Sequence, residues 1–550
     1  MGGSKRSSTR RDFLLRSGAA TIASFATPLA TSTARAAAGP VDDVQAAGAS
    51  DVHAGPKRKD RAYEIRQSAA MYHKNAAATR QNVNGDEERY QNRIASFTKS
   101  LPHSRNGEVE PQAYERLLRA VKSGSADDFE EIPLGGLAKL ADPLAAYSYV
   151  LEGADPHQFT MDPPPAFASL EQAGEMAELY WQALLRDVPF SEYGSHSIAI
   201  AAAEDLSRFP QFKPAAGGTL DAKYLFRGRT RGDLVGPYIS QFLLKDIQYG
   251  TRRLDQKIRT TVPGDDYLVN YASWLAVQNG GASGANRLDL TLRHILTGRD
   301  LAEFVHQDFT YQAFLDAALI LLTMRVPFDS RNPYRNSVTQ SGFGTFGGPH
   351  VLDLVARVSS CALKACWAQK WLVHRRLRPE EFGACVHNTK TGVAAYPIHE
   401  ALLTSPVLDA VSRRHHSYLL PQAYPEGAPM HPSYPAGHAA IAGACATALK
   451  AVFHEPHVIA EPVMPSSTGL AIVPYSGYDR LTVGGELDKL ASNIAFGRNI
   501  AGVHYLSDGI GGLKLGEEVA LSVLRDMKDC FTQLFRGFSL TRFDGTTITV

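Results

Sequence analysis

The sequence predicts an all-α protein, mainly a helical bundle, rather than a mixed α/β fold. Long segments after residue 236 place apolar residues at positions i, i+3, i+4 and i+7, the spacing of a helix face packed against a core. We find no repeat of fixed period and no sustained alternation of strands with helices along the sequence. With 550 residues, the chain is long enough for one large core or two packed core units.

The first 36 residues resemble a twin-arginine export signal. Arg10 and Arg11 stand before a weakly apolar stretch, and residues 34–36 read Ala-Arg-Ala, a pattern that suits a cleavage site. The alternative interpretation is a basic N-terminal tail. The signal predicts a folded protein exported from a bacterial cytoplasm, with a mature chain that begins near Ala37 and a periplasmic or secreted location.

The remaining chain divides by composition into three regions. Residues 37–87 are rich in Ala, Gly, Ser, Asp and Lys, which predicts a flexible N-terminal arm. Residues 88–235 alternate helical patterns with proline-rich connections, and we expect an N-terminal helical region there. Residues 236–550 contain the longest periodic segments and are expected to form the helical bundle that carries the functional site.

Within this last region we expect core helices, one long loop and a hairpin. The expected helices lie within 236–254, 266–280, 301–324 and 350–377. Residues 326–348 are polar and glycine-rich, which predicts a loop that lines an entrance or carries function. The last residues, 537–550, predict a short hairpin that turns at Asp544 and Gly545.

Composition limits the function classes. Lys and Arg number 57 against 56 Asp and Glu, so the net charge of +1 gives no sign of binding to nucleic acid or to an anionic membrane. The most apolar segment, 304–324, is interrupted by histidine and aspartate, so we expect no membrane span. Five cysteines without metal-ligand spacing predict buried thiols rather than a disulfide scaffold.

A first candidate site is the stretch 431–438, HPSYPAGH, which precedes an apolar helix. Pro432 and Pro435 disfavour the helical region for the residues before them, so the helix is expected to begin near Gly437. The unpaired N–H groups of Gly437 and His438 at that helix start would form a cradle for an anion. The alternative is an ordinary helix start with two surface histidines.

Two further stretches hold cations and an imidazole. In GRNIAGVHYLSDGIGG, Arg498 precedes His504 by six residues and Asp508 follows it by four, so on one helix face the carboxylate would hold a ring nitrogen. In KWLVHRRLRP, Lys370 and Arg378 are eight residues apart, about 80° on a helical wheel, and would lean to one side of a helix that ends at the next proline. Taken alone, an ion pair and a helix-dipole cluster would explain both stretches.

Together the three stretches match one known signature. The order K-x7-R-P, P-A-G-H and R-x5-H-x3-D resembles the vanadium-dependent haloperoxidases, a branch of the type 2 phosphatidic acid phosphatase superfamily. Residues 235–250, 272–280 and 376–388 extend the resemblance over most of residues 90–525. The lysine–arginine spacing, and a histidine seven residues before His438, look more like the bromoperoxidases than the fungal chloroperoxidases. The resemblance implies two packed helical bundles with minor β-hairpins.

The resemblance also implies a vanadate cofactor and a role for each matched residue. Three cations would neutralise the oxygens of vanadate: Lys370, Arg378 and Arg498. The Gly437 N–H would donate to one oxygen, His504 would bind vanadium, and Asp508 would orient His504. His438 would act as acid and base, and Lys370 would polarise hydrogen peroxide while halide attacks it. Vanadium would act as a Lewis acid throughout, so no electron-transfer partner is needed.

Two positions set expectations about affinity and selectivity. Ala436 stands where many members have serine, and the missing hydroxyl removes one hydrogen bond to the oxyanion, worth about 1.5–3 kcal/mol if charge-assisted. At the place of His431, chloride-oxidising fungal enzymes carry an aromatic residue and bromide-oxidising relatives a histidine. The resemblance therefore favours bromide or iodide over chloride, unless His431 is a structural residue bonded to a backbone carbonyl.

We therefore expect a homo-oligomeric enzyme whose partners are hydrogen peroxide, halide and a small organic acceptor, and whose products are hypohalous acid and halogenated organics. Two other functions stay open. One is an acid phosphatase in which His504 attacks the phosphorus of a monoester and His438 protonates the leaving alcohol. The other is a non-catalytic oxyanion-binding protein, motivated by Ala436.

Overall fold

The computed structural model describes residues 56–77, 79–214 and 218–550. The chain divides after Ala62, and residues 63–550 form one compact unit. The predicted export signal, residues 1–36, lies outside the described residues. The stretch expected to form an arm is described only from residue 56, where it holds α1 and α2.

The fold is built mainly of helices, and the prediction of an all-α class with minor hairpins is confirmed. The α-helices are α1 (Pro56–Asn75), α2 (Asp86–Arg89), α3 (Pro111–Ser123), α4 (Ala126–Glu130), α5 (Leu170–Leu185), α6 (Ser197–Leu206), α7 (Tyr271–Gln278), α8 (Gly298–Gln307), α9 (Gln312–Thr323), α10 (Gly348–Ala368), α11 (Pro379–Thr391), α12 (Glu400–Leu403), α13 (Pro406–His415), α14 (Gly437–Val452), α15 (Val483–Ile500) and α16 (Leu506–Lys528). A π-helix, η8 (Gln369–His374), continues α10.

Short elements connect these helices. The 3-10 helices are η2 (Pro143–Tyr147), η3 (Pro156–Gln158), η4 (Phe190–Glu192), η5 (Pro210–Phe212), η6 (Ala222–Tyr224) and η7 (Gln241–Leu243). Three antiparallel hairpins pair β1 (Ile247–Tyr249) with β2 (Arg252–Leu254), β3 (Val463–Pro465) with β4 (Ile472–Pro474), and β5 (Ser539–Thr541) with β6 (Thr547–Thr549). The last hairpin turns through Gly545 at φ 85°, as predicted.

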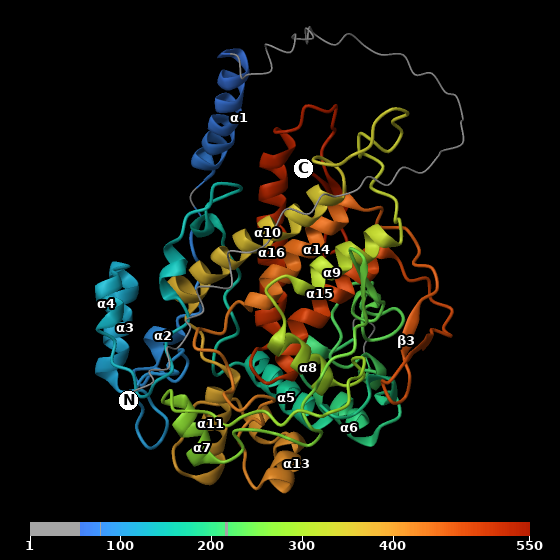
Figure 1. The fold of residues 1–550 in the computed structure, drawn as a ribbon. Helices are drawn as coiled ribbons and strands as arrows, with labels where there is room; N and C mark the ends of the chain where they lie inside the picture. The colour runs from blue at the N-terminus through green and yellow to red at the C-terminus, as the bar shows by residue number, and fades with distance from the viewer. Residues whose placement is uncertain (1–55, 78, 215–217) are drawn as a thin grey trace, which may run out of the picture. The chain divides into compact units, whose positions relative to one another are not determined.

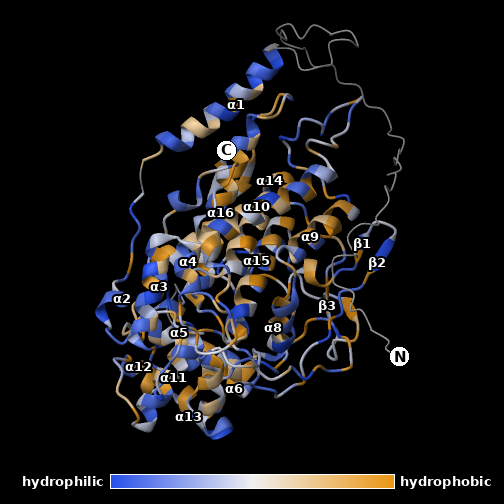
Figure 2. Ribbon diagram, turned by 60° about the vertical axis from the view of Figure 1, so that its left-hand side comes forward, coloured by the Kyte–Doolittle hydropathy of each residue, from blue (hydrophilic) through white to orange (hydrophobic). Residues whose placement is uncertain are grey.

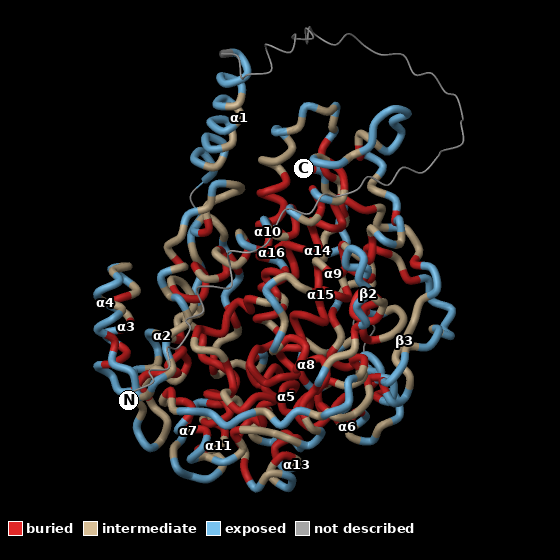
Figure 3. Tube along the Cα trace, in the orientation of Figure 1, coloured by how far each residue is buried: buried red, intermediate tan, exposed pale blue. Residues whose placement is uncertain are grey.

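The core lies around α14, which packs against α10, α15 and α16 (Figure 1). All residues of α14 except His438 are buried, because most of its own side chains are small and neighbouring helices can pack closely around it. Hydrophobic residues gather on these central helices (Figure 2), and the buried part of the trace follows them (Figure 3). The core therefore fixes the starts of α14 and α16, which carry two of the three predicted motifs.

Glycines let α14 and α16 approach closely. A Cβ on Gly516 would lie 2.0 Å from the backbone oxygen of Ala440, and one on Gly443 would lie 2.2 Å from that of Leu513. Real Cβ atoms do not approach backbone this closely, so only glycine fits at either position. This contact holds the two helix starts side by side.

Three predicted helices differ from the structure. Residues 236–254 form η7 and the β1–β2 hairpin, because Gly250, at φ 63°, permits a tight turn and alternating Ile247 and Tyr249 suit a strand. The segment 301–324 is two helices, α8 and α9, broken at Asp308 in an extended conformation.

The third difference concerns the Lys370–Arg378 stretch. It is not one helix: the helical backbone stops at His374, Arg375 is left-handed at φ 36°, and Arg378 is the N-cap of α11. Pro379 begins a helix rather than ending one, because a proline at the first helical position loses no hydrogen bond. Among the described residues, no helix combines the length and the apolar character needed to cross a membrane.

Candidate oxyanion-binding site

His504 and Asp508 form a buried pair at the start of α16. The helix begins at Leu506, three residues later than predicted, yet His504 Nδ1 donates to Asp508 Oδ2 at 2.9 Å. The backbone N–H of Tyr505 donates to the same oxygen, so Asp508 also caps the helix. With Nδ1 bonded to the carboxylate, Nε2 of His504 is left as an acceptor, and burial holds the pKa of the ring well below its usual value.

Arg376 and Ser433 also hold Asp508. Arg376 donates to Asp508 Oδ1 at 2.7 Å and to Glu175 at 2.9 Å, and the Ser433 hydroxyl donates to Asp508 Oδ2. Burial opposes ionisation of Asp508, but Arg376 and His504 keep its pKa far below the ordinary value. The carboxylate is therefore charged and fixed in one orientation.

Arg378 connects all three motifs. Its Nη1 donates to His504 Nε2 at 3.0 Å and to the Val503 carbonyl at 2.8 Å, and its Nε donates to the His431 carbonyl at 2.9 Å. The side chain is fully buried, and burial lowers its pKa to about 10. Arg378 thus lies where the extended 431–435 segment meets the start of α16.

Lys370 points into the same cluster from the π-helix η8. Its Nζ donates to the carbonyl oxygens of Pro432 and Ser433 at 2.7 and 2.8 Å, which leaves one of its three donors unused. The pKa of Lys370 is lowered to about 7, mainly by burial; Arg378 and Arg498 also lower it, whereas Cys366 and Asp508 raise it. In the absence of an anion, the buried ammonium group is therefore close to losing its proton.

Arg498 enters from the last turn of α15. Its Nη1 donates to the Val305 carbonyl at 2.9 Å and lies 3.4 Å from the Tyr424 hydroxyl. The Nε of Arg498 is buried, and no hydrogen-bond partner for it is found in the described part of the chain. Arg498 also acts electrostatically on Lys370 and Arg378, so the three predicted cations form one group.

The start of α14 is arranged as predicted at Gly437. Within the described residues, the N–H groups of Gly437, His438 and Ala439 have no hydrogen-bond partner, as expected of a free helix N-terminus. Ala436 is the fully buried N-cap, and its side chain offers no cap hydrogen bond. His438 Nε2 lies 3.0 Å from Asp308 Oδ1, and 30 % of the His438 side chain is exposed.

His431 contacts Arg378, not His438. Arg378 Nη2 lies 2.9 Å from His431 Nδ1, and the Trp367 ring packs on His431 with the centroids 4.8 Å apart. Burial and the neighbouring cations hold the pKa of His431 well below its usual value, so the ring is neutral. A direct bond to His438 is not found among the described contacts.

The cluster fits a bound anion. Other buried cations are paired with carboxylates, as Lys99 is with Glu380 and Arg186 with Asp266. In the part of the chain that the structure describes, no carboxylate pairs with the three predicted cations: Lys370, Arg378 and Arg498. Buried charges without partners are costly, so an anion held by these side chains and by the α14 N-terminus would balance them.

Sequence reasoning missed four residues of the cluster: Trp367, Arg376, Ser433 and Asp308. Arg376 adjoins a predicted residue, but only the tertiary fold brings it to Asp508. Asp308 had a usable signal, because a charged residue inside an apolar segment suggests a break or a buried partner. No metal-binding group of three or more His, Cys, Asp or Glu side chains is found among the described residues. The oxyanion cluster is thus built mainly from cations.

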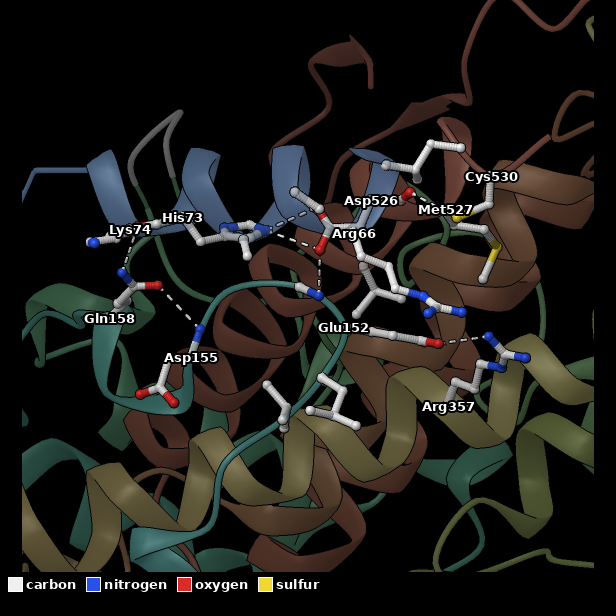
Figure 4. A pocket seen from close by; sticks show the side chains of 17 residues that line it. Arg66, His73, Lys74, Glu152, Asp155, Gln158, Arg357, Asp526, Met527 and Cys530 are labelled. Carbon is white, nitrogen blue, oxygen red and sulfur yellow. Dashed lines mark hydrogen bonds and ion pairs between the residues drawn. The ribbon is translucent and has the colours of Figure 1, made fainter. Parts of the chain in front are cut away.

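A cavity of about 760 Å³ lies elsewhere in the unit of residues 63–550 (Figure 4). Its lining includes Ile65 and His73 of α1, Glu152, and Asp526 of α16, and His73 pairs with Asp526 at 2.9 Å. No residue of the predicted site lines it. Cavity size alone therefore does not mark the functional site.

The chain is similar to known proteins over most of its length. The family model for the VCPO second helical-bundle domain matches residues 355–533. Vanadium-dependent bromoperoxidases of Corallina officinalis and Ascophyllum nodosum are 35 % and 34 % identical; the alignments cover 85 % and 90 % of this chain and 94 % of each relative.

A solved structure is similar to this one over most of the chain. The homohexameric second vanadate-dependent bromoperoxidase of Ascophyllum nodosum matches with a TM-score of 0.85 and 29 % identity, over 94 % of both chains. The chain belongs to the vanadium-dependent haloperoxidase family, and it is therefore an enzyme that uses vanadate as its cofactor to oxidise halide with hydrogen peroxide.

Proposed function

We propose that this enzyme oxidises bromide and iodide in preference to chloride and releases hypohalous acid, which halogenates organic molecules. The observation that carries the proposal is the buried, neutral His431 between Arg378 and Trp367. An imidazole there adds polar atoms to the anion site that a phenyl ring would lack, which changes how strongly the site activates peroxide. The names of the relatives, which are bromoperoxidases, support the same halide.

We assign the cofactor-holding roles as the sequence predicted them. Lys370, Arg378 and Arg498 would neutralise the anion, and the Gly437 N–H would donate to it. His504 Nε2 would bind vanadium, because Asp508 occupies the other ring nitrogen. When bound, vanadate supplies a Lewis acid that activates hydrogen peroxide without a change in oxidation state.

His438 would move protons during turnover. Its Nε2 is held by Asp308, so proton exchange with peroxide or water would occur at Nδ1. The partial exposure of the ring supports this role, because a proton carrier needs access to solvent. Lys370 would polarise peroxide with its unused N–H.

Replacing His431 tests the halide preference. Bromide and chloride oxidation should be compared in the wild type and in His431→Phe across about pH 4 to 8. We expect the preference for bromide to narrow and the pH optimum to move. If the ratio of bromide to chloride oxidation rates and the pH profile were identical in both proteins, His431 would play no part in selectivity.

Two further substitutions separate cofactor binding from proton transfer. His504→Ala should lose vanadium on dialysis, as measured by elemental analysis. His438→Ala should keep vanadium but lose about 100-fold to 10,000-fold in turnover, the usual contribution of an acid/base group. Stoichiometric vanadium in His504→Ala, or full turnover in His438→Ala, would contradict the assignment. A phosphomonoester assay run in parallel tests the acid phosphatase alternative.

We also propose export by the twin-arginine route and assembly into a homo-oligomer. The Arg10-Arg11 pair and the small-residue pattern at 34–36 support export, and the homohexameric relative supports assembly. In a bacterial host, replacing both arginines with lysine should retain the protein in the cytoplasm, and the exported form should begin near Ala37. Light scattering after size exclusion measures the assembly, and a monomeric mass would argue against it.

A further inference from the structure

A second pocket, of about 430 Å³, lies beside the proposed proton-transfer residues. Asp308 is part of its lining, and Asp308 is also the residue that holds His438 at 3.0 Å. The inner wall of the pocket is therefore one side chain away from the site where oxidised halogen would form. Its volume lies within the range of about 300–1,000 Å³ that is usual for small-molecule sites.

The lining suits a small aromatic molecule with a polar substituent. Ile258, Leu288 and Phe304 supply apolar surface, and polar atoms beside it come from Glu303, Gln307, Asp308 and Gln312. The Oδ1 of Asn286 is buried and, among the residues that the structure describes, has no hydrogen-bond partner, so a ligand hydroxyl that reaches it would satisfy it. Arg259 is exposed, and within the described residues it makes no ion pair. Because Glu303 and Asp308 also line the pocket, a neutral hydroxyl suits it better than a negative substituent.

The walls of the pocket are held by backbone hydrogen bonds. Two extended segments pair with each other, since Ile258 N–H donates to Arg293 C=O and Asp289 N–H donates to Thr260 C=O, both at 2.8 Å. Phe304 lies on α8, whose start is fixed by a capping box. A pocket with such walls is preformed, which reduces the entropy lost when a ligand binds.

We propose that this pocket binds the organic acceptor, an electron-rich phenol, and that halogenation is directed to it; this rests on the proposed function. The phenolic hydroxyl donates to Asn286, and the ring lies on Leu288 and Phe304. A ring carbon forms a bond to bromine, and the Br–O bond of hypobromous acid breaks with its electron pair on oxygen. The ring carbon then releases its proton, and water is the second product.

A competition assay tests the proposal without depending on the overall rate. A small para-alkylphenol and the same phenol tethered to a long polyethylene glycol chain are supplied together with peroxide and bromide. Reagent hypobromous acid attacks both rings freely and gives the reference product ratio. The vanadate-loaded wild type should favour the small phenol roughly tenfold above that ratio, a typical discrimination by an apolar pocket.

Two neighbouring leucines provide a matched pair of variants. Leu288 lines the pocket and is 42 % exposed, whereas Leu290, 88 % exposed on the same segment, does not line it. Leu288→Asp should return the product ratio to that of the reagent, and Leu290→Asp should keep the wild-type ratio. Saturation-transfer NMR of the cofactor-free proteins with the small phenol should show contact in the wild type and Leu290→Asp, and less in Leu288→Asp.

The outcomes separate this inference from the proposed function. If the wild type oxidises bromide but gives the reagent ratio, the oxidised bromine diffuses away and the pocket proposal is wrong. An equal loss of selectivity in both leucine variants would also overturn it. If the wild type consumes no bromide at all, the proposed function is wrong, and the pocket proposal, which rests on it, is wrong as well.

Discussion

At the scale of single residues, the cluster depends on how Asp508 is held. Arg376 uses its guanidinium to contact Asp508, Glu175, Ser507 and Gln172, and it packs on the Tyr505 ring at 3.8 Å. Asp508 in turn holds His504. Arg376 would therefore act on the proposed cofactor position through Asp508 and His504.

Replacing Arg376 with lysine should weaken vanadate binding. The charge is kept, but an ammonium group cannot reproduce the four directed contacts, so His504 is less well oriented. We expect vanadate affinity to fall about 10-fold to 100-fold, the usual cost of losing a partner of a metal ligand. Calorimetric titration of vanadate into the cofactor-free protein measures this affinity.

The adjacent arginine is the control for this prediction. Arg375 is also mostly buried and ion-paired, but its partner is Glu87 and it does not contact Asp508. Arg375→Lys should reduce stability without changing the affinity for vanadate. If Arg376→Lys and Arg375→Lys bound vanadate with the same affinity, Arg376 would have only a structural role.

Ala436→Ser should tighten anion binding. A hydroxyl at this N-cap can accept from a free N–H of α14 and donate to the anion at the same time, whereas the alanine does neither. We expect the dissociation constant of vanadate to decrease, and the free energy of unfolding to rise by about 0.5–2 kcal/mol. Competition between vanadate and phosphate reports the first change and chemical denaturation the second. Unchanged binding with a raised stability would place the anion away from residue 436.

At the scale of elements, the packing of α14 on α16 positions the site. Gly516→Ala would place a Cβ 2.0 Å from the backbone of Ala440, so one helix must move. We expect a loss of about 3 kcal/mol or more in the free energy of unfolding, because overpacking against backbone cannot be relieved by a side-chain rotation. Thermal and denaturant unfolding measure the loss.

Gly348→Ala is the matched control for this helix contact. Its Cβ would lie 3.6 Å from the Leu322 side chain, an ordinary contact at the start of α10. Stability should change little, and vanadate affinity should stay as in the wild type. A Gly516→Ala protein as stable as this control would show that the helices can separate without cost.

The elements also show how far sequence could predict the site. The start of α14 and the pairing of His504 with Asp508 followed from local rules, because prolines and an i,i+4 spacing act within a few residues. Arg376 could not be found this way, since its partners Glu175 and Asp508 lie 201 and 132 residues away. For Asp308 the sequence signalled a break in an apolar segment but not its partner, because it reaches His438 only through the tertiary fold.

Local patterns were also ambiguous where helix and strand spacing overlap. The segment 236–254 has apolar residues at both helical and strand spacing. The turn at Gly250 favours the β1–β2 hairpin over a helix. Pro379 was misread because proline both ends and begins helices. The K-x7-R spacing was nevertheless informative, since Lys370 and Arg378 reach one cluster from two different helices.

At the scale of the whole molecule, the uncompensated cations connect anion binding, pH and stability. In the anion-free protein, burial lowers the pKa of Lys370 to about 7 from its ordinary value of 10.5. Between these two values the unfolded chain binds the proton and the folded chain does not. Lys370 alone therefore makes the anion-free fold more stable as the pH rises from about 7 to 10.5.

A bound dianion should cancel this trend. It keeps Lys370 protonated, so binding takes up a proton above about pH 7, and affinity should fall by up to about tenfold for each pH unit above that value. Sulfate is the suitable probe, because it stays a dianion throughout this range. We expect sulfate to raise the unfolding temperature more at pH 6 than at pH 8.5, as measured by calorimetry at fixed sulfate concentration. In Lys370→Met the increase should be smaller and nearly independent of pH, and a wild-type response that does not change with pH would show that Lys370 keeps its proton without the anion.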